Sequence, residues 1–120
     1  MIKVEVEFVL TPEMVDQILV TAFDASYGGS NYWADLEDLR TETHDGDSLW
    51  TQVTVIEKEN GQRHFIDAER IAFGLKKYIE DDQIGESHLA ETINSQATDF
   101  DANDADVIVQ LAVFGEVTYG

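Results

Sequence analysis

The segment DFDANDADVIVQ, close to the C-terminus, has carboxylates at the spacing from which a calcium loop can be built. Asp99, Asp101 and Asn103 stand at the alternating positions that supply the first ligands of such a loop. The positions that give the loop its specificity differ, because Asp104 replaces the turn glycine and Gln110 replaces the bidentate glutamate. Capping of a helix explains these carboxylates more simply, so the sequence predicts no metal site.

Other residues that could do chemistry lack the context that a reaction needs. Gly28 and Gly29 follow an expected helix instead of preceding one, which argues against a phosphate-binding loop. The histidines are scattered without the spacing of a metal pair, and no serine stands in a nucleophile elbow. Glu37 and Asp38 could act as acid and base on a glycoside, but adjacent acids arise by chance in a chain with 25 of them. We therefore expect no enzyme and no cofactor.

Charge is the most prominent property of the chain. Asp and Glu number 25 against 7 Lys and Arg, which gives a formal net charge of −18, and no Lys or Arg follows Lys77. A surface of this sign repels nucleic acid and anionic membranes and attracts basic proteins or cations. We therefore expect a basic protein partner, with no direct contact to nucleic acid or membrane.

Length and composition indicate a single folded domain over residues 1–120. An apolar fraction of 43% and a single proline argue against disorder despite the charge. The chain has no cysteine, and its N-terminus alternates charged with apolar residues where a secretory leader would have a hydrophobic run. These features predict a soluble, unsecreted protein of the cytoplasm, and they fit either a monomer or a homodimer.

Hydrophobic periodicity predicts an α+β domain in which three or four antiparallel strands pack against three or four helices, in the order β-α-β-β-β-α-α-α. The N-terminal half is expected to hold a strand over 2–10, a helix that starts at Pro12 and is stopped by a left-handed Gly28-Gly29, and strands over 31–40 and 49–59. Asn60-Gly61 predicts a two-residue hairpin turn into a strand over 62–66.

Three helices are expected in the C-terminal half. They cover residues 68–79, 86–97 and 102–114, and the last is apolar nearly all round and ends at Gly115. Residues 116–120 are expected to be extended and to add to an edge of the sheet.

Two blocks, YGGSNYWA and DANDADVIVQLAVFGEVTYG, resemble those of small acidic proteins of unassigned activity in bacteriophages and prophage-bearing bacterial genomes. In composition the chain is also similar to phage inhibitors of host defence, including anti-CRISPR and anti-restriction proteins, several of which present carboxylates where the target expects DNA phosphates. This resemblance implies an inhibitor that acts in the host cytoplasm and binds a basic nucleic-acid-binding protein or complex.

The predicted partner-binding residues form two acidic patches and two aromatic anchors. The first patch follows a strand and its turn and comprises Asp35, Glu37, Asp38, Glu42, Asp45 and Asp47. The second lies at helix ends and comprises Glu80, Asp81, Asp82, Glu86, Asp99, Asp101, Asp104 and Asp106. Trp33 and Trp50 are either core residues or exposed anchors for an arginine-rich surface.

Two other functions remain open at this point. A structural or housekeeping protein of a phage or a salt-loving organism would use its acidity for solvation alone and would spread carboxylates over all faces. A carboxylate-dependent or divalent-metal enzyme would need a cleft that holds at least two carboxylates with raised pKa values.

Overall fold

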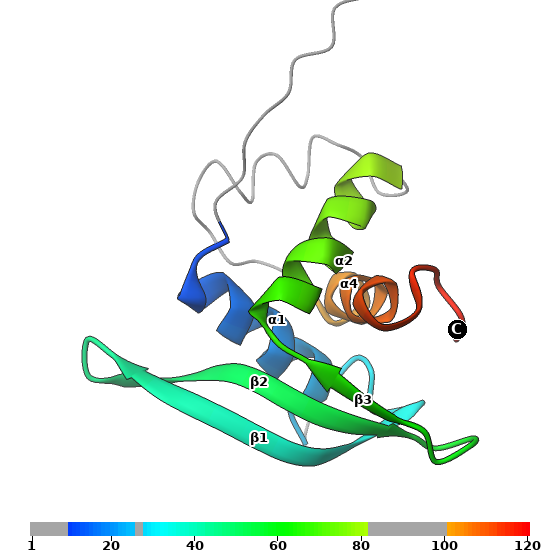
Figure 1. The fold of residues 1–120 in the computed structure, drawn as a ribbon, viewed down its shortest axis with the longest axis horizontal. Helices are drawn as coiled ribbons and strands as arrows, with labels where there is room; N and C mark the ends of the chain where they lie inside the picture. Colours follow the sequence, from blue (N-terminus) through cyan, green and yellow to red (C-terminus); the bar gives the residue numbers. More distant parts are fainter. Residues whose placement is uncertain (1–9, 26–27, 82–100) are drawn as a thin grey trace, which may run out of the picture.

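The computed structural model describes residues 10–25, 28–81 and 101–120. The expected strand over 2–10, except Leu10, and the expected helix over 86–97 lie outside these residues. The elements are α1 (Pro12–Phe23), β1 (Ala34–His44), β2 (Asp47–Glu57), β3 (Arg63–Ile66), α2 (Ala68–Asp81) and α4 (Ala102–Phe114). The strands form one antiparallel sheet in the order β1-β2-β3, and the helices lie on one side of it (Figure 1). The predicted α+β class is confirmed.

Helix α1 begins as its sequence predicts and ends earlier. The Thr11 side chain accepts a hydrogen bond from the Met14 amide at 3.2 Å, and Pro12 occupies the first helical position. The helix buries one stripe against the sheet and α4, formed by Met14, Val15, Ile18, Leu19 and Ala22. It ends at Phe23, five residues before Gly28.

The glycine pair therefore does not stop the helix, and the expected left-handed conformation is wrong, because neither glycine has a positive φ. Both glycines are needed for close approach instead. A Cβ on Gly29 would lie 2.1 Å from the Ala102 carbonyl oxygen, at the start of α4. The amide of Gly29 also donates to the Thr21 carbonyl at 3.0 Å, which satisfies a group at the end of α1.

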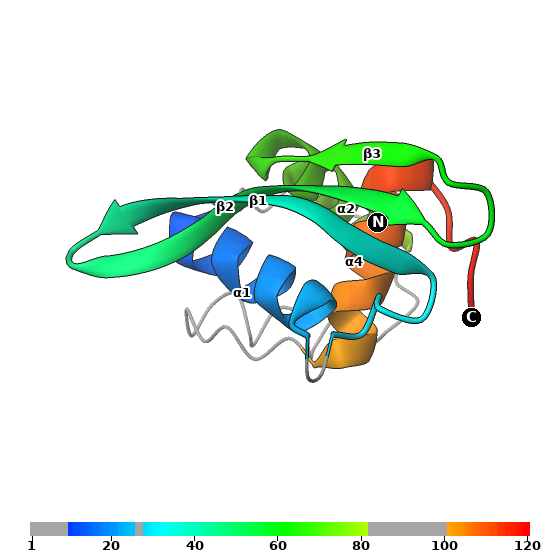
Figure 2. The same cartoon turned by 90° about the horizontal axis from the view of Figure 1, so that it is seen from below.

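Strands β1 and β2 form a long hairpin closed by a two-residue turn. Asp45 and Gly46 both have positive φ values, 50° and 88°, as a type I′ turn requires. β3 pairs only with Val53–Ile56 of β2, so the distal part of the hairpin is two-stranded. Both views show the hairpin tip reaching past the N-terminal end of α1 (Figures 1 and 2).

The connection from β2 to β3 is longer than its sequence predicts. The Glu57 amide donates to the Gln62 carbonyl and the Gly61 amide donates to the Glu57 carbonyl, each at 2.8 Å. Only Gly61 has a positive φ, 74°, so residues 58–61 make a four-residue loop in place of the expected two-residue turn. The predicted antiparallel return of residues 63–66 is confirmed.

Helices α2 and α4 pack closely to complete the core. α4 is capped by Asp101 and Asp104 in a capping box and ends at Gly115, whose φ is 76°, and both features agree with the sequence. Ile71, Leu75 and Tyr78 of α2 are buried, and Gly74 lies against the α4 backbone. Of the helices that the structure describes, none has both the length and the apolar character to cross a membrane.

Replacing Gly74 with alanine tests this close helix contact. Replacing glycine with alanine in a helix interior normally stabilises the helix by about 1 kcal/mol. Here its Cβ would lie 2.3 Å from the Ile108 carbonyl oxygen, so backbone must move. We expect Gly74→Ala to lower the free energy of unfolding in urea by about 1–3 kcal/mol. Glu69→Ala, on the exposed side of the same helix, should change it by less than about 0.5 kcal/mol, and an equally small effect at Gly74 would contradict the packing.

Candidate functional site

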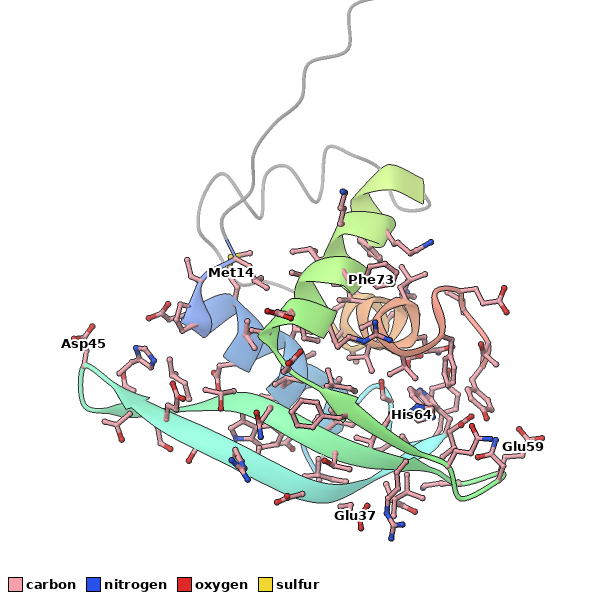
Figure 3. The ribbon with its side chains drawn as sticks, in the orientation of Figure 1. Met14, Glu37, Asp45, Glu59, His64 and Phe73 are labelled. Atoms are coloured by element: carbon pink, nitrogen blue, oxygen red, sulfur yellow. The ribbon has the colours of Figure 1, made fainter. Side chains whose placement is uncertain are left out.

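The first predicted acidic patch lies together on the β1–β2 hairpin, and all its members are exposed. We call these six residues the acidic hairpin patch: Asp35, Glu37, Asp38, Glu42, Asp45 and Asp47. Four come from β1, Asp45 is in the turn and Asp47 begins β2. Figure 3 shows Asp45 at the tip of the hairpin and Glu37 on the side of the sheet away from the helices.

A β-bulge at Glu37 decides how these carboxylates face. Leu36 pairs with Val55 and Asp38 pairs with Thr54, so Glu37 is an extra residue without a partner on β2. Because Val55 faces the core, Leu36 lies on the core side of the sheet and Asp38 on the open side. A regular strand would place Asp38 on the same side as Leu36, so the bulge is what puts Asp38 on the open side.

Two cations and one histidine lie beside members of the acidic hairpin patch. Arg63 Nε donates to Glu37 Oε2 at 2.7 Å, Lys58 Nζ lies 3.6 Å from Asp35 Oδ1, and His44 Nε2 lies 3.7 Å from Glu42 Oε2. Exposed pairs of this kind contribute about 0–1 kcal/mol each. Asp38, Asp45 and Asp47 have no ion pair within the described residues. The patch therefore keeps an excess of negative charge that a partner can use.

Asp106, which the sequence analysis placed in the second patch, is buried. Its Oδ1 accepts hydrogen bonds from Ser30 Oγ and Trp33 Nε1, each at 2.8 Å. Its Oδ2 accepts from Tyr32 Oη at 2.8 Å and from Gln110 Nε2 at 3.1 Å. The prediction that Asp106 binds a partner is therefore wrong: its carboxylate joins α4 to the loop before β1.

Asp104 is buried as well, so the prediction of an exposed carboxylate is wrong for a second member of that patch. It accepts a hydrogen bond from Tyr78 Oη at 2.5 Å and so links α4 to α2. Burial, followed by this hydrogen bond and the nearby negative charge, raises the pKa of the Tyr78 hydroxyl. Asp101 remains exposed, but its side chain caps α4 by accepting from the Asp104 amide at 2.7 Å.

The rest of the second patch is not assembled by the described residues. Glu80 and Asp81 belong to the last turn of α2. Asp82, Glu86 and Asp99 lie outside the described residues. The described residues therefore bring together the surface patch on the hairpin, and of the second patch they leave only Asp101 exposed.

Neither tryptophan is an exposed anchor. Trp33 is 2% exposed and stacks on Tyr119, with ring centroids 5.2 Å apart and planes 9° from parallel. Trp50 is partly buried against the core, and its amide donates to Asp16 Oδ1 at 2.7 Å. The interpretation of both as core residues, which the sequence left open, is the correct one.

Residues 116–120 do not extend the sheet, which corrects the expectation for this tail. The side chain of Gln110 holds them instead: its Oε1 accepts from the amides of Thr118 and Tyr119, each at 2.8 Å. Its Nε2 donates to the Tyr119 carbonyl at 3.1 Å. The signal that could have revealed this role is a lone glutamine within an otherwise apolar stretch of α4.

Sequence reasoning also missed a polar cluster around Glu57. Tyr119 Oη donates to Glu57 Oε1 at 2.6 Å, and His64 Nε2 is hydrogen-bonded to Glu57 Oε2 at 2.8 Å. Burial alone would raise the pKa of Glu57, but the hydrogen bonds from Tyr119 and His64 outweigh it and hold that pKa below its ordinary value. A sign in the sequence is that Glu57 stands in phase with the buried Val53 and Val55.

This cluster holds the tail against the sheet. Both oxygens of Glu57 are engaged by side chains of the protein. A lowered pKa also keeps Glu57 ionised at neutral pH, whereas a carboxyl group that serves as a catalytic acid needs a raised one. Within the described ranges, no group of three or more histidine or acidic side chains is placed to hold a metal ion.

Comparison with family models, curated proteins and solved structures finds no match to this chain. The resemblance to small acidic phage proteins therefore stays a prediction.

Asp106→Asn tests whether this carboxylate is a structural group. The asparagine amide nitrogen would face hydroxyl or amide donors in place of an acceptor, so we expect unfolding in urea to become easier by about 1–3 kcal/mol. Asp38→Asn removes the same charge on the hairpin surface and should change stability by less than about 0.5 kcal/mol. Similar values for the two variants would mean that Asp106 is not the buried acceptor described here.

Alkaline titration tests the carboxylate–tyrosine contacts. Burial and the hydrogen bond to Asp106 raise the pKa of Tyr32 to about 12, although the residue as a whole is 53% exposed. The hydrogen bond to Glu57 likewise raises the pKa of Tyr119. The unfolded chain ionises its tyrosines near pH 10. The stability that these contacts contribute is therefore fully present below that pH and is lost as pH rises toward 12.

The measurement is tyrosinate absorbance recorded together with circular dichroism. While the dichroism remains native, we expect Tyr32, Tyr78 and Tyr119 to stay largely protonated at pH 11. Ionisation of all four tyrosines near pH 10 in the folded protein would contradict these contacts.

Proposed function

We propose that this chain is a non-enzymatic acidic binding protein that occludes a basic, nucleic-acid-binding surface of another protein. The observation that carries the proposal is the concentration of exposed carboxylates on the acidic hairpin patch, which runs along β1 to a hairpin tip that projects beyond the helices (Figure 1). Charge complementarity of this kind steers association and selects partners of opposite sign.

The exposed acids are unevenly spread over the described surface. Six of them lie within the short segment from Asp35 to Asp47. The others are single residues on separate elements: Glu13, Glu59, Glu69, Asp101 and Glu116. Acidity that served solvation alone would not require this concentration, so the distribution favours a binding role.

Two bases of α2 lie away from the hairpin tip. Arg70 and Lys77 of α2 lie over the ring of Phe73, with their charged groups 5.5 and 5.6 Å from its centroid. Figure 3 shows Phe73 on α2, well separated from Asp45 at the hairpin tip. The carboxylates at the hairpin tip are therefore not neutralised by these two bases, and they remain able to attract a basic surface.

The charge density of β1 limits what the patch can imitate. An 11-residue strand spans about 35 Å and carries Asp35, Glu37, Asp38 and Glu42, whereas a DNA strand carries a charge about every 3.4 Å. The hairpin therefore does not copy phosphate spacing. It carries fewer charges than a DNA strand of the same length. It competes with nucleic acid because its carboxylates stand on a sheet that is already ordered, so that little conformational entropy is lost on binding.

The resemblance to phage inhibitors of host defence extends the proposal to the class of target. A nucleic-acid-binding complex of host defence has grooves lined with Lys and Arg, and an acidic hairpin can enter such a groove and exclude the natural ligand. The protein would then act as an inhibitor of the anti-CRISPR or anti-restriction type.

The proposal is tested with two triple variants that change the net charge by the same amount but at different places on the surface. A hairpin variant carries Asp38→Asn, Glu42→Gln and Asp47→Asn. A matched control carries Glu13→Gln, Glu69→Gln and Glu116→Gln, which change the net charge equally at scattered positions. Proteins captured from nuclease-treated extract at low salt are identified, and their displacement from DNA by each variant is measured.

We expect the hairpin variant to bind about tenfold more weakly than the control, since three exposed pairs together contribute about 1.4 kcal/mol. The parent should lose affinity steeply with added salt. Equal affinity of the two variants for every captured protein would end the proposal and favour acidity as solvation.

A further inference from the structure

β1 is an edge strand whose outer side is open in the described structure. It spans 11 residues and pairs with β2 alone among the described strands. Residues 35–38 and 40–43 are exposed, so no described helix or loop covers this edge. The backbone amides and carbonyls on the outer side of such a strand are ready to pair with another extended chain.

The other edge of the hairpin is partly covered, which makes β1 the more accessible side. Near the core, β2 pairs with β3 from Val53 to Ile56. Beyond the end of β3, the Trp50 amide donates to Asp16 Oδ1 of α1 at 2.7 Å. Among the described residues, an incoming strand therefore finds a longer run of unpaired backbone on β1 than on β2.

The residues along the open edge indicate which chain can pair there. Proteins protect edge strands with bulges and charges, and β1 has register shifts between Leu36 and Asp38 and between Arg40 and Thr41. Its charges are mostly of one sign, because Arg40 is the single base among four acids. A second copy of β1 is repelled by that sign, whereas a strand rich in lysine or arginine is attracted.

We propose that β1 accepts an extended basic segment of the partner as a fourth strand of the sheet. This inference rests on the proposed function and names the partner's contacting element. Main-chain hydrogen bonds to β1 supply the affinity, and lysine or arginine side chains opposite Asp35, Asp38 and Glu42 supply the selectivity. The stretch from Thr41 to His44, which follows the second register shift and pairs regularly with β2, is where a continuous ladder begins.

The test uses synthetic peptides with the full protein. The probe is an acetylated and amidated peptide of about ten residues in which lysine and threonine alternate. The matched control has the same sequence with several consecutive central amides N-methylated, which preserves charge and length but removes the donors on both sides of the strand. A third peptide carries glutamate in place of lysine.

Calorimetry and backbone amide exchange by NMR give the readout. We expect the methylated peptide to bind at least tenfold more weakly than the probe, and the glutamate peptide not to bind. On addition of the probe, amides of residues 41–44 should exchange at least tenfold more slowly. Equal binding of the two lysine peptides would overturn the inference and leave electrostatic occlusion standing.

Two further outcomes separate the alternatives. If outer amides of β1 are already protected from exchange in the free protein, the edge is occupied and the inference is wrong. Sedimentation at the same concentration then shows whether a second copy or another part of this chain occupies it. If no lysine peptide binds while a captured basic protein still binds through the hairpin carboxylates, the inference fails and the proposed function survives. If neither binds, both fail.

Discussion

The buried carboxylate of Asp106 is the contact on which the arrangement of the molecule depends. An ionised carboxylate away from water costs several kcal/mol unless donors surround it, and here Ser30, Tyr32, Trp33 and Gln110 supply four. Three of these donors belong to the loop that leads into β1. The carboxylate therefore fixes where the first strand begins relative to α4. Through Gln110 it also helps to hold the C-terminal tail over Trp33.

The acidic residues serve two opposite purposes, and burial separates them. Asp104, Asp106 and Glu57 are enclosed by hydroxyl, amide and imidazole donors and tie segments together that lie far apart in the chain. The carboxylates of the hairpin are exposed and repel one another. For Glu42, Asp45 and Asp47 that repulsion acts on the two-stranded part of the hairpin, beyond the end of β3, where solvent screens it. The charge is thus carried where a partner can reach it and where the core does not have to compensate for it.

Local patterns predicted most of the elements and the exposed part of the candidate site. Thr11-Pro12 at the start of α1, the Asp101–Asp104 capping box and Gly115 after α4 act within a few residues of one another, so they can be recognised in any fold. The hairpin acids were found for the same reason, because Asp45-Gly46 defines its turn locally. The glycine pair misled, since its role depends on the Ala102 backbone more than 70 residues away.

By itself, the sequence determined the sign of the surface, the α+β class and the caps at Thr11, Asp101 and Gly115, because composition and short-range patterns suffice for them. Only the tertiary structure decided which acids are buried, how the bulge at Glu37 turns Asp38 outward and which edge of the hairpin is open. The physical reason is that burial of a carboxylate depends on donors brought from distant segments. An aspartate beside such donors holds the core together, while an identical aspartate without them faces solvent.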